Sequence, residues 1–153
     1  MKEARKELKV SAIENGTVID HIPAGSVYQV MRILKLDECQ EQILFGTNLE
    51  SKKYGTKGII KVRNRYFADN DLNKIAIAAP TASIIVIKDY QVIEKKLVET
   101  PNEIMQFVRC VNPNCITNVE DVTTKFKVIT DNGTKLQCHY CEKFTEERNM
   151  VFI

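Results

Sequence analysis

Four cysteines in the last third of the chain restrict its possible folds more than any other sequence feature. Cys110 and Cys115 are separated by four residues, Cys138 and Cys141 by two, and 22 residues lie between the two pairs. Two short loops that each direct two thiolates toward one point are typical of tetrahedral zinc sites with four sulfur ligands. The spacing therefore predicts that these four cysteines bind one structural zinc ion (Zn2+) per chain.

The residues between the two cysteine pairs support this arrangement. Segments 126–130 and 134–137 flank Asp131-Asn132-Gly133, which is a strong signal for a β-hairpin. A hairpin would bring the second cysteine pair beside the first. Because roughly 50 residues seldom bury enough apolar area to fold alone, we expect this part of the chain to depend on the metal.

Other uses of the cysteines remain open at this point. Two disulfides, an iron–sulfur cluster or a redox C-x2-C pair are alternatives. A start without a leader favours a reducing compartment, which argues against disulfides. A redox role is weakened because CHYC does not open a helix beside a βαβ unit. His139 is expected to be exposed rather than a fifth ligand. Cys39 stands outside the pattern and is expected to be a partly buried structural thiol.

The first hundred residues alternate between strand and helix signals. Strands are expected at 9–22, 42–50, 57–64, 82–89 and 90–98, and helices at 26–34, with Ser26 as N-cap, and at 72–79, ended by Pro80. This order is that of a ferredoxin-like α/β sandwich, in which two helices cover one face of an antiparallel sheet. The other face is then available for a ligand or partner.

The periodicity fades near Pro101, where the cysteine region begins. We therefore predict an α+β chain with two domains, a ferredoxin-like sandwich at residues 1–100 and a small all-β zinc-ribbon-like domain at residues 101–153.

One predicted strand carries a row of cations. Alternation along the strand places on one face a mostly basic set, Lys57, Ile59, Lys61, Arg63 and Arg65. Ile60 and Val62 would then enter the core. Such a row suits an anionic ligand, although a solvated, charge-protected edge strand explains these residues equally well.

Asp20 and His21 form an ionisable pair at the end of an apolar, strand-like run. Successive strand residues point to opposite faces, so one of the two should meet solvent, a ligand or another chain. Lysines bind phosphate, an aspartate accepts hydrogen bonds from ribose, and strand backbone can read a base edge, so a nucleotide would use all these groups. A Gly-rich phosphate loop is absent from the sequence, so such a site must rest on side chains and strand backbone.

Composition and motifs argue against several other classes of protein. The sequence contains no nucleophile motif, so catalysis within this chain is not expected. Residues 101–153 carry 6 basic and 7 acidic residues, which disfavours the main alternative, a zinc-ribbon protein that binds nucleic acid. The charged start and the lack of an apolar run of about 18 residues predict a cytoplasmic protein that does not associate with membranes.

The stretch GTVIDHIPAG at 16–25, together with CVNPNC and CHYCE later in the chain, resembles the regulatory chain of aspartate carbamoyltransferase. The resemblance extends from about Leu8 to Phe144. It implies a non-catalytic subunit in pyrimidine biosynthesis, with an allosteric domain that binds nucleotide effectors of the CTP, ATP and UTP class. It further implies that the zinc domain contacts the catalytic chain and that two regulatory chains form a homodimer.

The resemblance also implies roles for individual residues. The nucleotide-binding positions would be Val10, Ile13, Asp20, His21, Ile59, Lys61, Tyr90, Val92 and Lys95. Asp20 would hold the ribose, while His21 and Lys95 would approach the phosphates. The positions near the catalytic chain would be Asn112, Asn114 and Glu142, although the two asparagines serve equally well as turn residues of the cysteine loop.

One position departs from the family pattern. Ile85 stands where the best-known members have an asparagine, which removes a side-chain hydrogen-bond partner. The preferred effector and the sign of its response therefore do not follow from the resemblance.

Overall fold

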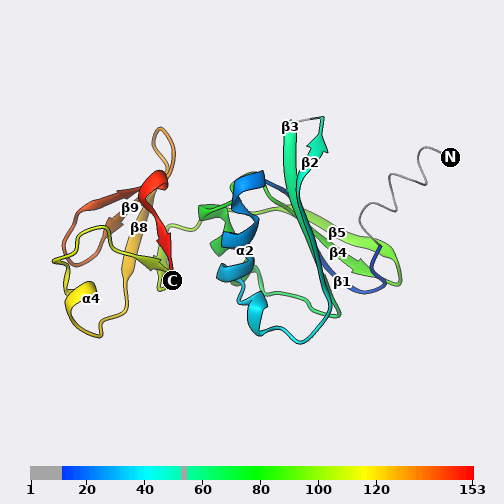
Figure 1. Cartoon of the computed structure of the whole chain (residues 1–153), viewed down its shortest axis with the longest axis horizontal. Coiled ribbons are helices and arrows are strands. Elements are labelled where there is room, and N and C mark those ends of the chain that lie inside the picture. Colours follow the sequence, from blue (N-terminus) through cyan, green and yellow to red (C-terminus); the bar gives the residue numbers. More distant parts are fainter. Residues whose placement is uncertain (1–11, 53–54) are drawn as a thin grey trace. The chain divides into compact units, whose positions relative to one another are not determined.

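A five-stranded antiparallel sheet organises the first part of the chain (Figure 1). The structure is a computed structural model that describes residues 12–52 and 55–153, so candidate residue Val10 lies outside the described residues. The strands are β1 (Gly16–Ile22), β2 (Ile43–Ser51), β3 (Gly55–Arg63), β4 (Ser83–Lys88) and β5 (Gln91–Leu97). Their spatial order is β2-β3-β1-β4-β5.

Two helices, α2 (Val27–Ile33) and α3 (Asp69–Lys74), lie on one side of this sheet (Figure 1). Short 3-10 turns cover Ala24–Ser26, Leu36–Glu38 and Ile75–Ile77. The order strand, helix, strand, strand, helix, strand, strand is the one predicted, and the α+β, ferredoxin-like fold class is confirmed. The second helix differs in detail, because its predicted span is α-helical only to Lys74 and then tightens into a 3-10 turn.

The main core lies between the sheet and the helices. Ile19 of β1 is paired with Ile60 of β3 and Ile84 of β4, and all three side chains are buried. Val27 of α2 is also fully buried, and a Cβ added at Gly58 would lie 2.1 Å from its Cγ2 atom. Glycine at this position of β3 therefore permits the close approach of α2 to the sheet.

The opposite face of the sheet is less open than the sequence indicated. Ile59 was predicted to lie among exposed cations, but it is buried in a small cluster with Ile13, Val18 and Ile87. Arg65 does not extend the row either, because β3 ends at Arg63. Alternation assigned Ile59 to the correct face, but it does not reveal that apolar residues of neighbouring strands cover that face.

The chain divides into two compact units, Met1–Glu99 and Thr100–Ile153. The second contains β6 (Glu103–Met105), β7 (Val108–Arg109), the single-turn helix α4 (Ile116–Val119), β8 (Lys125–Ile129), β9 (Lys135–Cys138), β10 (Phe144–Glu146), a 3-10 turn (Glu147–Asn149) and β11 (Val151–Phe152). One sheet has the order β10-β9-β8-β6, and β11 pairs with β7.

The predicted hairpin connects β8 and β9. Asn132 and Gly133 have φ angles of 53° and 99°, a conformation that glycine and asparagine tolerate best. Phe126 of β8 and Leu136 of β9 are fully buried and form the centre of this small core. No helix in the described part of the chain is long and apolar enough to cross a membrane.

Candidate metal centre and ligand-binding face

The four predicted metal ligands lie together in the second unit. The sulfur atoms of Cys110, Cys115, Cys138 and Cys141 are all within 4.8 Å of one another. The Cys110–Cys141 and Cys115–Cys138 sulfur pairs are 3.6 and 3.7 Å apart. A tetrahedron with zinc–sulfur bonds of about 2.3 Å has sulfur–sulfur edges of about 3.8 Å. The spacing of the thiols therefore fits one zinc ion.

The backbone around each cysteine pair fixes this geometry. Cys110 follows β7 and Cys115 directly precedes α4, and the backbone N–H of Cys115 donates to the Asn112 carbonyl at 3.0 Å. Cys138 ends β9, and its carbonyl accepts the Glu142 N–H at 3.0 Å. Each cysteine loop thus contains a turn closed by its own hydrogen bond, which suits a metal site built from two loops.

Hydrogen bonds also reach the sulfur atoms. The hydroxyl of Thr117 donates to Cys115 Sγ at 3.2 Å, and the backbone N–H of Tyr140 donates to Cys138 Sγ at 3.4 Å. Burial raises the pKa of the Cys110 and Cys138 thiols. Burial acts in the same direction on Cys115, but the hydrogen bonds, led by that of the Thr117 hydroxyl, outweigh it and lower the pKa of this thiol to about 7. Four thiolates at this spacing, three of them buried, need a cation to compensate their charge.

Two further expectations concern residues outside the ligand set. His139 is exposed, its ring packs against Tyr140 with centroids 5.0 Å apart, and it is not part of the metal group found among the described residues. Cys39 is half-buried and carries a free thiol.

The predicted partner residues lie in the first cysteine loop, between Cys110 and Cys115, or directly after Cys141. Asn114 and Glu142 are exposed, whereas Asn112 is half-buried and its side-chain oxygen accepts the Asn114 N–H at 3.1 Å. The turn-forming role of Asn112 is therefore present. Sequence reasoning missed Asn118, whose side-chain amide donates to the carbonyls of Cys110 at 3.0 Å and Asn112 at 2.7 Å.

In the first unit, the sheet face away from the helices brings most of the predicted nucleotide-site residues together. Strand pairing aligns one residue from each strand in a single row, Leu44, Lys61, Val18, Ile85 and Lys95. The row places Lys61 and Lys95 on either side of an apolar centre. Ile13 and Ile59 belong to the same apolar cluster, and Val92, which is exposed, pairs with cluster member Ile87.

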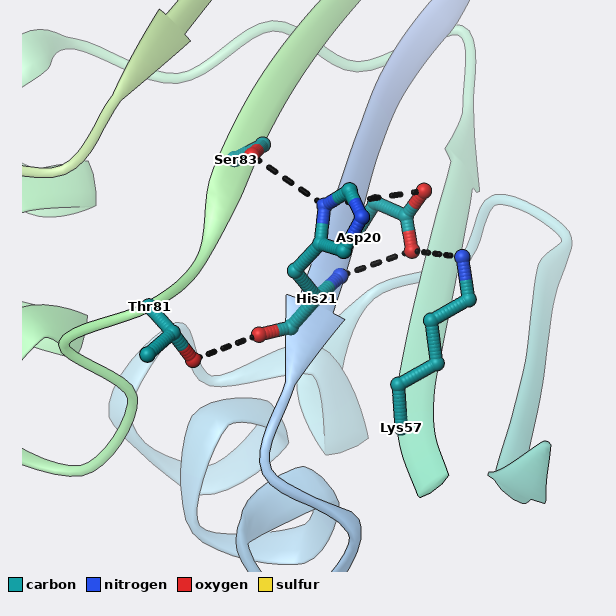
Figure 2. Close-up of polar contacts among 5 residues, drawn as sticks. All are labelled: Asp20, His21, Lys57, Thr81 and Ser83. Atoms are coloured by element: carbon teal, nitrogen blue, oxygen red, sulfur yellow. Dashed lines mark hydrogen bonds and ion pairs between the residues drawn. The ribbon is translucent and has the colours of Figure 1, made fainter. Parts of the chain in front are cut away.

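Asp20 lies beside this row and is held by an ion pair that sequence reasoning did not assign. Its carboxylate is 2.8 Å from the Lys57 ammonium, and the two side chains are only 15% and 21% exposed (Figure 2). The same carboxylate accepts the backbone N–H of His21 at 2.7 Å. The signal for Lys57 was present in the predicted row of cations, but its partner, 37 residues earlier in the chain, could not be identified without the strand register.

His21 departs from the alternation expected of a strand. Its φ angle is 57°, and the register between β1 and β3 shifts between Ile19 and Ile22. As a result its ring lies near the Asp20 carboxylate, 4.0 Å away, and 3.3 Å from the Ser83 hydroxyl, while the Thr81 hydroxyl donates to its carbonyl at 2.8 Å (Figure 2). The bulge therefore brings Asp20 and His21 together instead of separating them onto opposite faces.

The electrostatics of Lys61 suit an anionic ligand. Partial burial lowers its pKa, and the nearby Asp20 carboxylate opposes this shift. A partly desolvated ammonium gains more from an added anion than a fully hydrated one. Lys95, on the same face, and Tyr90, in the turn between β4 and β5, are both exposed to solvent.

A cation-flanked apolar face and a four-thiol metal module in one chain define a ligand-binding protein with a structural metal domain. Family models identify it further. Residues 8–99 match the allosteric domain of the aspartate carbamoyltransferase regulatory chain, and residues 102–151 match its metal-binding domain. The chain belongs to the family of aspartate carbamoyltransferase regulatory chains.

Curated relatives agree with this assignment over nearly the whole chain. The regulatory chain of Thermococcus sibiricus is 53% identical over 146 residues, which cover 95% of this chain and 96% of the relative. That of Pyrococcus abyssi is 51% identical over 147 residues, covering 95% and 97%. That of Bacteroides fragilis is 43% identical over 153 residues and covers both chains completely.

These matches decide between the functional alternatives. The family consists of regulatory chains rather than catalytic subunits, in agreement with the prediction that the chain is not an enzyme. The match of a metal-binding domain and the clustered thiols are consistent with one structural zinc ion. The zinc-ribbon protein that binds nucleic acid is not favoured.

Proposed function

We propose that the first unit binds nucleoside triphosphate effectors on the sheet face opposite its helices, and that binding changes the activity of an associated catalytic chain. The observation that carries this proposal is the row in which Lys61 and Lys95 flank an apolar centre beside Asp20. Apolar side chains can receive a base, and the lysines can bind phosphates. An effector acts only through unequal affinity for two states of the assembly, typically about 1–3 kcal/mol of coupling.

Co-purification with the catalytic chain of the same source tests the proposal. The complex is expected to give aspartate saturation curves that shift when CTP, ATP or UTP is added. The isolated catalytic chain, as control, is expected to give curves that do not respond. Identical curves for the complex with and without every nucleotide would contradict the effector role.

The second unit is proposed to hold Zn2+ through Cys110, Cys115, Cys138 and Cys141 and to dock on the catalytic chain. Three exposed apolar side chains near the cysteines support docking, those of Val111, Ile116 and Tyr140. With the exposed Asn114 and Glu142, they supply both apolar and polar side chains, as partner interfaces do. Tyr140→Ala is expected to reduce co-purification while zinc content stays at one ion per chain, and Tyr90→Ala in the other unit serves as control. Undiminished co-purification of Tyr140→Ala would remove this surface from the interface.

A regulatory-chain homodimer is proposed through the β2 edge of the sheet. The Tyr28 and Phe45 rings, 67% and 46% exposed, meet edge to face with centroids 6.0 Å apart beside this edge strand. Unpaired strand backbone next to exposed aromatic rings is a surface on which a second copy can pair. Tyr28→Ser combined with Phe45→Ser should lower the mass measured by light scattering. A dimeric double variant would exclude this edge.

A cytoplasmic location is proposed as well, because a reducing compartment keeps the four thiols available for metal. Zinc content and thiol state in protein purified from the native cells test it. Disulfides in place of bound zinc would contradict this location.

A further inference from the structure

The side chain of Thr117 contacts one of the proposed zinc ligands, although Thr117 is not itself part of the cysteine motif. It stands two residues after Cys115, in the single-turn helix α4, and its hydroxyl donates to Cys115 Sγ at 3.2 Å. A threonine in the first turn of a helix can direct its hydroxyl to nearby backbone, but here the acceptor is a sulfur atom of the proposed metal site.

The sulfur that Thr117 contacts belongs to the inner half of the thiol cluster. Cys115 and Cys138 are each only 1% exposed, and their sulfur atoms are 3.7 Å apart. Cys141 is more accessible. A thiolate buried to this extent has little access to water, so a protein hydroxyl supplies a hydrogen bond that solvent would otherwise provide.

The neighbouring interactions hold Thr117 in place independently of the metal. The Asn118 and Val119 backbone N–H groups both donate to the Cys115 carbonyl, at 2.8 and 3.2 Å, and close the turn of α4 around Thr117. The Asn118 side chain also ties α4 to the Cys110 carbonyl. Thr117 therefore lies in a hydrogen-bonded turn that is tied to both cysteines of the first loop.

We propose that Thr117 is a positioning residue of the zinc site, whose hydroxyl orients the Cys115 thiolate and moderates the charge that this sulfur donates to the metal. The proposal rests on the assignment of zinc to the four cysteines. Outer groups that hydrogen-bond to metal ligands typically change metal affinity by about 10- to 100-fold when they are removed. Thr117→Val keeps the shape of the side chain and removes only the donor.

Competition between full-length protein and a chromophoric zinc chelator measures the effect of the substitution on zinc affinity. Thr117→Val should bind zinc about 10- to 100-fold more weakly than the unmodified chain, and Thr117→Ser should restore most of the affinity because it keeps the hydroxyl. Thr123→Val, at an exposed threonine of the same unit, is the matched control and should bind zinc normally. If Thr117→Val does not fold, Thr117→Ala takes its place.

Cobalt substitution separates positioning from a general loss of stability. In Co2+-loaded protein the thiolate-to-cobalt charge-transfer band should shift in Thr117→Val and return in Thr117→Ser. Thr124→Val removes a buried hydroxyl that donates to the Val108 carbonyl at 2.8 Å, so it should lower stability without shifting the band.

The outcomes distinguish the two levels of the proposal. If unmodified protein binds no zinc, the metal assignment fails. If zinc is bound but Thr117→Val matches the unmodified chain in affinity and cobalt spectrum, or if Thr117→Ser is as weak as Thr117→Val, the positioning role is refuted.

Discussion

Replacement of Lys61 by methionine should weaken nucleotide binding strongly while leaving the sheet intact. Methionine keeps an apolar stem of similar length next to Val18 and removes the charge. An ammonium and a phosphate charge about 4 Å apart attract by roughly 4 kcal/mol at an effective dielectric constant of about 20. Lys61 also interacts with Asp20, and binding removes water from the ammonium, so part of this attraction is offset.

The net effect should be close to that of one charge-assisted hydrogen bond, about 1.5–3 kcal/mol. This free energy corresponds to binding that is roughly 10- to 150-fold weaker. Isothermal titration of the full chain with CTP and ATP measures it. Lys74→Met removes a cation from α3, on the helix-covered side of the sheet, and should leave nucleotide affinity unchanged.

The lowered pKa of Lys61 gives the same prediction a pH dependence with a definite sign. Phosphate favours the protonated ammonium, so binding raises the pKa of Lys61 and takes up protons at alkaline pH. Affinity should therefore fall as the pH rises through the lowered pKa of the free protein, below the ordinary value of 10.5. Lys61→Arg stays charged and should lack this decline.

The stability of the nucleotide-free fold responds to pH in the opposite direction from nucleotide affinity. Between the lowered pKa of Lys61 and 10.5 the unfolded chain binds more protons, so stability contributed by this residue increases with pH across that window. The role given to this lysine would be refuted if Lys61→Met bound nucleotide as tightly as the unmodified chain. It would also be refuted if the unmodified chain and Lys61→Arg showed the same dependence of nucleotide affinity on pH.

Three other predictions concern the fold that supports the two sites. Zinc removal by a strong chelator should abolish hydrogen-exchange protection in residues 100–153 but not in 12–52 and 55–99. A structural zinc contributes on the order of 10 kcal/mol to folding. Protection that survives in a metal-free second unit would contradict a structural role for the metal. Gly58→Ala should lower the free energy of unfolding by about 1–3 kcal/mol in urea titrations, because its Cβ meets Val27, whereas Gly25→Ala, with open space around it, should not. Gly133→Ala should lower the free energy of unfolding by about 1–2 kcal/mol, because φ is 99° at this position although an added Cβ would meet no neighbour. It should also weaken zinc binding by loosening the hairpin. Unchanged zinc affinity in competition with a chelator would show that the hairpin does not fix the second cysteine pair.

Features with strong local chemistry were predictable from the sequence. Zinc coordination requires a few residues of one type at restricted spacings, so the four cysteines and the Asn132-Gly133 turn indicated the metal module directly. The order of strands and helices followed from periodicity, because β1, β3, β4, α2 and α3 each bury apolar residues at regular spacing.

Features that depend on strand register were not predictable. Nothing local in the sequence marks His21 as a positive-φ bulge residue, and the bulge is what keeps it beside Asp20. The ion pair of Asp20 with Lys57 joins β1 to β3 and appears only once these strands are aligned. The Thr117 contact is an intermediate case, because a hydroxyl two residues after a helix-opening cysteine is visible in the sequence.

The cross-strand row that joins Lys61 to Lys95 also sets a length requirement on whatever occupies that face. Two strands, β1 and β4, lie between the strands that carry these lysines, so three interstrand spacings of about 4.8 Å separate their backbones by roughly 14 Å. A compact anion can neutralise one ammonium at a time, whereas an elongated molecule can reach both. Shortening a nucleotide by one phosphate after another should therefore reduce its binding in steps.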